Sequence, residues 1–347
     1  MGFSSFSSYG SKISGLGKAR VALGSLGSIS KSVQIFGGTG GVYLSYDKGL
    51  TYELPNTGTL GNGICGFDGK LLVTGGNNSI SWSSDFGRNW VVISNAVPLN
   101  IQKIIYIKET KVWFAVGICS NTSNRTIARS LNGIDWTLLE TTVFNRSRCY
   151  SVCYNVSTST YTASGYSNIA STASSSDGII WNLNTGFTFP SFKEAYYMFF
   201  DGTRYILGGL ARQNNIATSL DGVSWGLTGG SIDIDIRSFA YNGKDTYVAV
   251  GTQNGFRQDV IQMTYWSNDL ITWFPANDNL LGLVIFYVEW NGTYFIASGY
   301  TRKDVSPAYG NTTAYSIDGK NWTKSLDNPF GATTYSGTTY ITYNSSS

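Results

Sequence analysis

The chain has 347 residues, of which 24 are basic, 21 are acidic and none is histidine. Without histidine, Ser-His and Cys-His catalytic triads and His-ligated metal sites are excluded. The formal charge is +3, and without the four basic residues of the first 32 it is −1, so the rest of the chain lacks the basic face that nucleic-acid binding requires and we expect no nucleic-acid partner. The best apolar run, Leu280 to Val288, is too short to span a membrane.

Residues 1–32 differ in composition from the rest of the chain. They are rich in Gly and Ser, contain no acidic residue and carry Lys12, Lys18, Arg20 and Lys31. They lack the continuous apolar core of a secretory signal peptide, although a Ser-rich, acid-poor segment is compatible with a plastid transit peptide. We therefore divide the chain into an N-terminal arm, 1–32, and one domain, 33–347, and expect the arm to anchor the chain to other proteins.

The domain is built from repeated pairs of β-type runs joined by turn signals. An aromatic or β-branched run leads to an Asp-Gly or Asn-Gly pair, and a second run follows that ends in Gly. The pairs are Asp68-Gly69, Asp201-Gly202, Asn242-Gly243 and Asn291-Gly292. Such pairs allow positive φ at both central residues of a tight hairpin. Each repeat is therefore predicted to contain strands a, b, c and d, with a tight turn between a and b.

Each repeat closes on a short phrase, Ser-x-Asp-Gly-x-x-Trp, which we call the box. The three full copies are Ser175–Trp181, Ser219–Trp225 and Ser316–Trp322. The four variants are Ser45–Tyr52 and Ser83–Trp90, with one extra residue before Gly, Ser130–Trp136, with Asn for Asp, and Ser267–Trp273, without Gly. The acidic or amide position is occupied by Asp47, Asp85, Asn132, Asp177, Asp221, Asp269 and Asp318, and the closing aromatic position by Tyr52, Trp90, Trp136, Trp181, Trp225, Trp273 and Trp322.

The spacing and chemistry of the boxes predict a structural role. Their closing aromatics stand 38 to 49 residues apart, which matches one four-stranded propeller blade per repeat. The Asp can accept a hydrogen bond from the backbone N–H two residues on, in an Asx turn, and Gly can take the positive φ that follows. The Trp ring is expected to fill the seam between neighbouring blades. None of these roles involves a ligand.

The box resembles the Asp box, or BNR repeat, of the sialidase-like β-propeller superfamily, over about residues 33–344. The resemblance implies an all-β fold with seven four-stranded antiparallel blades. It implies little about function, since the superfamily includes glycosidases, lectins, assembly factors and structural proteins. The short boxes also resemble those of structural proteins of large DNA viruses and phages.

The ends of the domain predict how the ring closes. The first repeat has no strand a, because Val33–Gly37 already resembles a strand b. Ala332–Tyr335 and Thr339–Tyr343 resemble strands a and b. We expect the C-terminal segment to supply the inner strand of the N-terminal blade, which leaves one strand b in surplus.

The four cysteines predict neither a disulfide nor a metal site. Cys149 and Cys153 stand four residues apart on one predicted strand, about 13 Å between Cα atoms, which is too far for a disulfide. No CxxC pair or histidine is present for zinc. Cys65, Cys119 and these two are expected to be free thiols, and no metal or other cofactor is expected apart from the Ca²⁺ considered next.

The most site-like stretch is Ile232–Arg237. Its strict alternation predicts a strand with Ile on one face and Asp233, Asp235 and Arg237 on the other, lining the centre of the ring. The two carboxylates could bind Ca²⁺ or act as an acid–base pair; the interpretation that we favour is a solvated wall in which Arg237 neutralises its neighbours. Other predicted inner strands carry residues that could converge with this stretch, namely Glu289, Glu194, Arg148 and Lys103.

Three hypotheses for function follow. The favoured one is a non-enzymatic structural or interaction propeller of a larger assembly, such as a virion surface or capsid, held through its arm and blade loops. The second is a glycan-binding propeller or sialidase-like glycosidase, although the family's Arg-Ile-Pro signature is missing. The third is a photosystem-type assembly factor. Each implies its own location: the virion, which we prefer, the extracellular space or the plastid.

Overall fold

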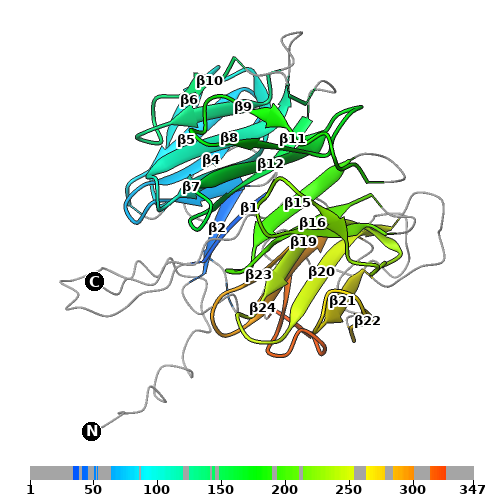
Figure 1. Ribbon diagram of the computed structural model, residues 1–347. Helices are drawn as coiled ribbons and strands as arrows, with labels where there is room; N and C mark the ends of the chain where they lie inside the picture. The colour runs from blue at the N-terminus through cyan, green and yellow to red at the C-terminus, as the bar shows by residue number, and fades with distance from the viewer. Residues whose placement is uncertain are drawn as a thin grey trace, which may run out of the picture.

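The computed structural model describes residues 34–38, 41–45, 51, 53, 64–85, 87–119, 125–140, 143–144, 148–189, 194–210, 214–253, 263–277, 284–300 and 313–325. All regular structure in these residues is β-strand, in 26 strands (Figure 1). The arm, Asp47 and Tyr52 of the first box, and the C-terminal segments 332–335 and 339–343 lie outside the described residues. Within these ranges there is no helix of the length and hydrophobicity needed to cross a membrane.

Six groups of four consecutive strands each form an antiparallel meander, and we number them units 1 to 6. Unit 1 contains β3 (Ile64–Phe67), β4 (Leu72–Gly75), β5 (Ser79–Ser83) and β6 (Val91–Ser94). Unit 2 contains β7 (Leu99–Ile107), β8 (Val112–Cys119), β9 (Ile127–Ser130) and β10 (Thr137–Leu138). Unit 3 contains β11 (Arg148–Asn155), β12 (Thr160–Tyr166), β13 (Thr172–Ser175) and β14 (Asn182–Leu183).

The second half of the chain repeats this plan. Unit 4 contains β15 (Ala195–Phe200), β16 (Tyr205–Gly209), β17 (Ile216–Ser219) and β18 (Gly226–Leu227). Unit 5 contains β19 (Ile234–Tyr241), β20 (Tyr247–Gln253), β21 (Thr264–Ser267) and β22 (Phe274–Pro275). Unit 6 contains β23 (Val284–Trp290), β24 (Phe295–Tyr300), β25 (Thr313–Ser316) and β26 (Thr323–Lys324). A hairpin of β1 (Gln34–Gly38) and β2 (Gly41–Ser45) precedes unit 1.

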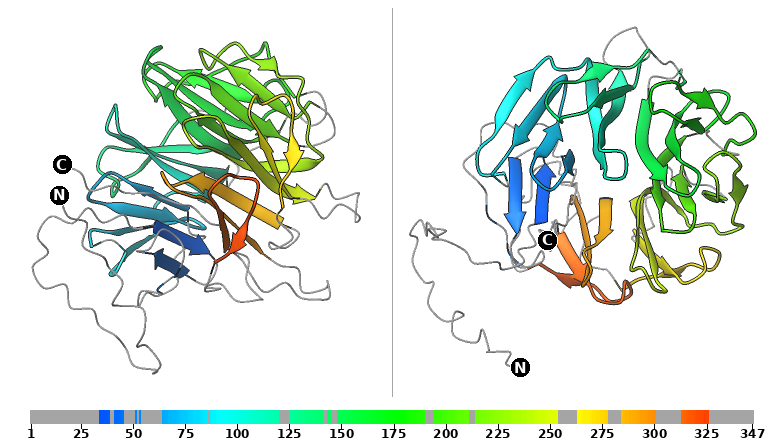
Figure 2. Two further views of the ribbon diagram at one scale, coloured as in Figure 1. Left: turned by 90° about the horizontal axis from the view of Figure 1, so that it is seen from below. Right: turned by 60° about the vertical axis from the view of Figure 1, so that its left-hand side comes forward.

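The units are arranged around a common centre (Figure 2). The first strand of each unit lies beside the first strand of the next, from β3 through β7, β11, β15 and β19 to β23, so that these strands form the inner side of the arrangement. The predicted all-β class and four-stranded antiparallel blades are confirmed. Units 2 and 3 are also joined by one residue pair, Arg148 with Ile118, and units 5 and 6 by Thr252 with Val284.

The turns between the first and second strands differ from the expected hairpin. Only the Gly of each pair has positive φ, for example +99° at Gly69 and +100° at Gly202. The residue before it stays at negative φ, because its side chain closes an Asx turn: Asp68 Oδ1 accepts the N–H groups of Lys70 and Leu71 at 2.8 and 2.6 Å. The prediction of two positive-φ residues was therefore wrong, although the turn lies where the sequence places it.

The core lies between units, because the second strands are buried on both faces. All four described residues of β4 and all five of β16 are buried. The Gly that ends such a run leaves room for the next unit: a Cβ at Gly208 would lie 2.6 Å from Ile236 and from Phe239. Side-chain hydrogen bonds cross the same seams, from Tyr205 to the carbonyl of Thr160 at 3.1 Å and from Tyr247 to Asp201 at 2.8 Å.

Candidate binding site on the inner strands

The box carboxylates bind their own turns. Asp221 Oδ1 accepts the N–H groups of Val223 and Ser224 at 2.8 and 2.7 Å, and the hydroxyl of Ser219 donates to the same oxygen. Ser219 in turn accepts the N–H of Gly222 at 2.8 Å. Equivalent bonds form at Asn132, Asp177, Asp269 and Asp318, and in the longer box Asp85 accepts from residues three and four positions on.

The variant box without Gly keeps the same backbone. Leu270 has φ +66° at the position where the other boxes have Gly, and its side chain is buried. A bulky residue in the left-handed region is strained. The turn is therefore imposed by the Ser267 and Asp269 hydrogen bonds rather than by Gly alone.

The box tryptophans lie over their own turns. The indole N–H donates to the carbonyl three residues back in five boxes, at 2.8 to 3.2 Å: Trp90, Trp136, Trp225, Trp273 and Trp322. Trp181 has no such acceptor among the described residues, and its ring packs edge-on against Phe114 of the preceding unit at 6.1 Å between centroids. The expected seam contact is therefore present at Trp181.

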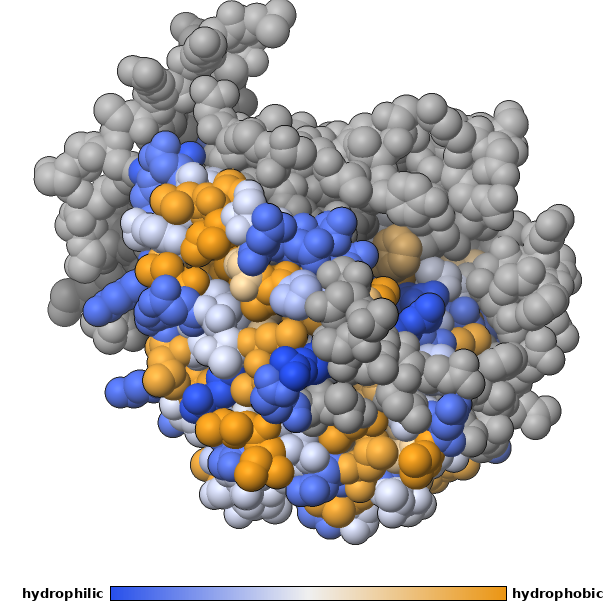
Figure 3. Space-filling model, turned by 90° about the horizontal axis from the view of Figure 1, so that it is seen from above, coloured by the Kyte–Doolittle hydropathy of each residue, from blue (hydrophilic) through white to orange (hydrophobic). Residues whose placement is uncertain are grey.

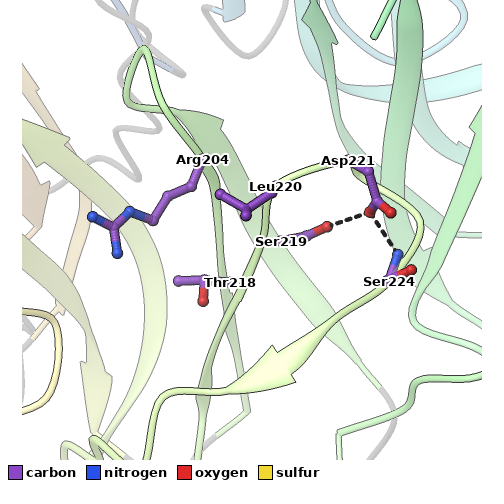
Figure 4. Close-up of a pocket in the computed structure, with 6 residues that line it drawn as sticks. All are labelled: Arg204, Thr218, Ser219, Leu220, Asp221 and Ser224. Carbon is purple, nitrogen blue, oxygen red and sulfur yellow. Dashed lines mark hydrogen bonds between the residues drawn. The ribbon is translucent and has the colours of Figure 1, made fainter.

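One box lines a surface pocket of about 460 Å³ (Figure 4). Its walls are formed by Arg204, Thr218, Ser219, Leu220, Asp221 and Ser224. The carboxylate there already accepts three hydrogen bonds, and Arg204 points away from it, with Nε 3.6 Å from Asp201 Oδ2. The Asp221 carboxylate and the Ser219 hydroxyl of this pocket are thus engaged in the turn.

β-Bulges on the inner strands position a different set of side chains. The first strands of units 2 to 6 each carry a bulge at the same place relative to the second strand of the unit. The bulged residues are Gln102, Tyr150, Tyr196, Arg237 and Phe286, and we call them the bulge rim. A bulge leaves one residue outside the ladder and re-aims its side chain, and bulges are frequent beside functional sites. All five side chains are half-buried.

Glu194, the residue immediately before β15, lies at the centre of the bulge rim. It is buried and accepts hydrogen bonds from Arg148 Nη1 at 3.2 Å, from the Tyr196 hydroxyl at 3.3 Å and from the Tyr150 hydroxyl. The two tyrosine rings meet edge to face, with centroids 5.1 Å apart. The carboxylate thus fixes three neighbouring side chains from units 3 and 4.

Arg237 completes the group from unit 5. Its guanidinium carbon lies 3.9 Å from the centre of the Tyr196 ring, and its Nε donates to Thr252 Oγ1 at 3.4 Å. This cation–π contact fixes the plane of the guanidinium. Asp235 is buried, whereas Arg148 is 45% exposed, so the arginines are more accessible than the acids beneath them.

The electrostatics of the bulge rim keep its phenols neutral. Burial and the charge of Glu194 raise the pKa of Tyr150 well above its ordinary value. Burial raises the pKa of Tyr196 to about 12, against the opposing charge of Arg237. Both hydroxyls are therefore hydrogen-bond donors at neutral pH.

A second layer is formed by the residues immediately after the bulges, and we call it the axial layer. Its members are Lys103, Ser151, Tyr197, Ser238 and Tyr287. Lys103 Nζ donates to Ser151 at 3.3 Å and lies 4.4 Å from the centre of the Tyr197 ring, two units away. Tyr197 packs edge-on against Tyr287 of unit 6, at 6.1 Å between centroids. These contacts cross the centre of the arrangement.

Glu289 lies beside this layer on β23. Its Oε2 is buried without a hydrogen-bond partner among the described residues. Burial raises the pKa of Glu289 to about 8, while the charge of Lys103 and a hydrogen bond from Tyr287 act in the opposite direction. The carboxyl group is therefore largely protonated at neutral pH.

The predicted inner-strand residues do not form one cluster. Arg148, Glu194 and Arg237 meet at the bulge rim, whereas Lys103 and Glu289 belong with the axial layer. Ile232, Ile234 and Ile236 are buried, as the alternation predicts. Asp235 is buried as well and Asp233 precedes β19, so the predicted solvated wall of carboxylates was wrong at Asp235. The strict alternation ends at Arg237, because it is the bulged residue and Ser238 is buried next to it. Sequence analysis did not identify Tyr150, Tyr196, Gln102 or Phe286.

In the part of the chain that the structure describes, no three His, Cys, Asp or Glu side chains gather to hold a metal ion. Calcium binding at Asp233 and Asp235 stays a prediction. All four cysteines lie among the described residues as thiols outside any disulfide; Cys65 and Cys149 are buried, and Cys119 and Cys153 are half-buried.

Comparisons with known proteins agree on the fold. No protein-family model matches the chain, and neither does any curated protein sequence. Among solved structures, YCF48 from Cyanidioschyzon merolae matches with a TM-score of 0.51 and 15% identity over 78% of this chain and 94% of that one. A structure of YCF48 bound to D1 peptide matches with a TM-score of 0.54 and 14% identity, over 77% and 88%.

The GH74 enzyme of Niastella koreensis matches with a TM-score of 0.59 and 15% identity. The match covers 83% of this chain but 46% of the enzyme, so this chain spans less than half of that protein. Identities this low bear on the fold alone. Together with the four-stranded units, these matches identify the fold as a β-propeller.

Proposed function

We propose that this chain is a non-enzymatic interaction propeller that binds a segment of a partner protein at the bulge rim. The observation that carries the proposal is the set of five bulges, which presents five half-buried side chains of four residue types at equivalent places. Tyr and Arg dominate protein-binding hot spots, and here Glu194 holds Tyr150, Tyr196 and Arg148 in fixed positions. Fixed side chains lose little entropy on binding.

The structure of YCF48 bound to D1 peptide supports a peptide as the kind of ligand, since that propeller shares the fold. The Tyr150 hydroxyl donates to Glu194. A glycosidase of the sialidase type needs a Tyr nucleophile beside a Glu base, so this pair makes the glycosidase the second candidate function, and the test below separates the two.

We further propose that the ring has seven Asp-box blades. The hairpin β1–β2 lies beside β3 in the way that β4 lies beside β7, so it takes the place of strands b and c in a further blade. Ala332–Tyr335 would supply the inner strand of that blade. The arm, 1–32, would anchor the propeller in a larger assembly. That this assembly is a virion remains a prediction from the sequence resemblance.

The test is a random-peptide display library panned on the immobilised full-length chain. Peptides that bind should lose at least tenfold in affinity for Tyr196→Ala and for Arg237→Ala, which corresponds to about 1.4 kcal/mol. They should bind Arg204→Ala as tightly as the parent, because Arg204 lines the pocket beside a box and does not belong to the bulge rim. Thermal unfolding confirms that each variant is folded.

Two outcomes would overturn the proposal. One is recovery of no peptide whose binding depends on the bulge rim. The other is hydrolysis of fluorogenic aryl glycosides by the parent that is lost in Tyr150→Phe, which would establish the glycosidase hypothesis instead.

A further inference from the structure

The outer edge of unit 1 differs from the outer edges of the other units. The last strands of units 2 to 6 have two residues each, and two of them carry Pro275 or Lys324. The last strand of unit 1, β6, has four residues and pairs with β5 along its whole length. Short strands, Pro and Lys are the usual means by which proteins prevent pairing at a sheet edge. At β6 none of them is present.

Three of the four side chains of β6 are apolar, and all four are at least partly accessible. Val91 is 48% exposed and Val92 is 50% exposed, and since successive residues of a strand point to opposite faces, each face of the edge carries an exposed Val. No described strand pairs with the outer side of β6. On the side of the molecule where β6 and β10 lie in Figure 1, the surface shows several apolar groups separated by hydrophilic ones (Figure 3).

We infer that a second copy of this chain pairs with β6, antiparallel and about a two-fold axis, to form a homodimer with a continuous eight-stranded sheet. The inference is independent of the bulge rim. Two residues that lie directly opposite in an antiparallel pair are on the same face of the sheet. About a two-fold axis, a residue can therefore lie opposite its own copy or opposite a residue an even number of positions away. With Val92 opposite Val92, Val91 lies opposite Ile93, so each face of the joint pairs β-branched aliphatic residues, which favour such pairing.

The charge distribution favours a second copy over a charged partner. No charged residue lies between Arg88 and Lys103 in the sequence, so two copies of β6 meet without like-charge repulsion. An acidic or basic strand would gain no ion pair at this edge. A sequence of β-branched residues that lacks charge is complementary to itself.

Sedimentation over a range of concentrations tests the association. The parent should be a dimer at high concentration and dissociate on dilution, and Val92→Lys should raise the dimer dissociation constant at least tenfold. Leu220→Lys is the matched control: Leu220 is 70% exposed, on a box turn of unit 4, and should leave the constant unchanged. Thermal unfolding shows whether either variant is folded.

A cross-link tests the register. Residues directly opposite in an antiparallel pair have Cα atoms about 4.5–5.5 Å apart, which fits a disulfide. Val92→Cys should therefore form a covalent dimer under mild oxidation, whereas Leu220→Cys and the parent, with its four native thiols, should not. A parent that is monomeric at every concentration, or a dimer that Val92→Lys does not weaken, would overturn the inference.

Discussion

The box turns and the bulge rim are two solutions to placing side chains in a repeated fold. In the boxes, the same residue types recur and form the same bonds within one turn, as Asp177 and Asp221 do. At the bulges, the backbone recurs but the side chains differ, with Tyr150, Arg237 and Phe286 at equivalent places. A recurring residue therefore marks a structural requirement, whereas a recurring backbone feature with changing residues marks a place where the units can diverge in function.

The largest difference between the two regions is expected on truncation of a buried box ring. Trp322 is 5% exposed and donates to the Gly319 carbonyl at 3.2 Å, so Trp322→Ala should lower the free energy of unfolding by about 3–5 kcal/mol. Phe286→Ala, at a half-buried bulge, should lower it by about 1 kcal/mol. Denaturant unfolding measures both. Equal losses would mean that the bulge residues are as structural as the boxes.

The second prediction concerns how the free energy of unfolding depends on pH through Glu289, which lies beside the axial layer and not in a box. The pKa of Glu289 is raised from 4.5 to about 8 in the folded state, so the folded protein holds this proton more tightly than the unfolded chain. The free energy of unfolding should therefore fall as pH rises from 4.5 to about 8, by about 3 kcal/mol once partial exposure of the side chain is allowed for.

Glu289→Gln should remove that fall and be more stable than the parent at pH 9. The control is Glu140→Gln, because Glu140 is an exposed residue that pairs with Arg125 on the outside of unit 2. Unfolding measured at several pH values checks both variants. A parent whose stability is flat between pH 5 and 8 would contradict the buried, protonated state of Glu289.

The third prediction concerns Asp318, whose contribution to the free energy of unfolding is lost as pH falls, whereas that of Glu289 is lost as pH rises. Partial burial raises the pKa of Asp318, but hydrogen bonds from the backbone N–H and side chain of Asn321 and from the N–H of Lys320 outweigh it and lower the pKa to about 2. A depressed pKa contributes stability above the unfolded value, and that contribution is lost as pH falls from 3.8 to about 2.

Asp318→Ala should therefore cost about 1–2 kcal/mol at pH 7, through loss of the turn hydrogen bonds. The difference between parent and variant should shrink at pH 2–3. Thermal unfolding at both pH values measures it. A difference that stays constant with pH would show that the ionised carboxylate is not what holds the turn.

The fold was predictable because its signals are local. The Ser, Asp and Gly of a box bond to one another within a few residues, so their order in the sequence is sufficient to place the turn. The Asp-Gly pairs were equally informative about position, although not about φ, because the side chain of Asp68 stabilises a conformation that a hairpin rule does not include.

The bulge rim could not be predicted in this way. A bulge is a change of register between two strands, and a shift by one residue moves every later side chain to the other face. The alternation through Arg237 gives no sign that Ser238 is buried beside it. Alignment of the repeats would have placed Tyr150, Tyr196 and Arg237 in one column, but nothing in their residue types marks that column.

The bulges also bear on how such a ring can change over generations. A bulged residue makes no pair in the ladder, so replacing it leaves the register of its strand intact. Each of the five bulged inner strands thus offers one position where a substitution costs the fold little and changes recognition. A lineage could retune what the ring binds by single substitutions, one blade at a time, while the Asp-box turns keep the scaffold constant.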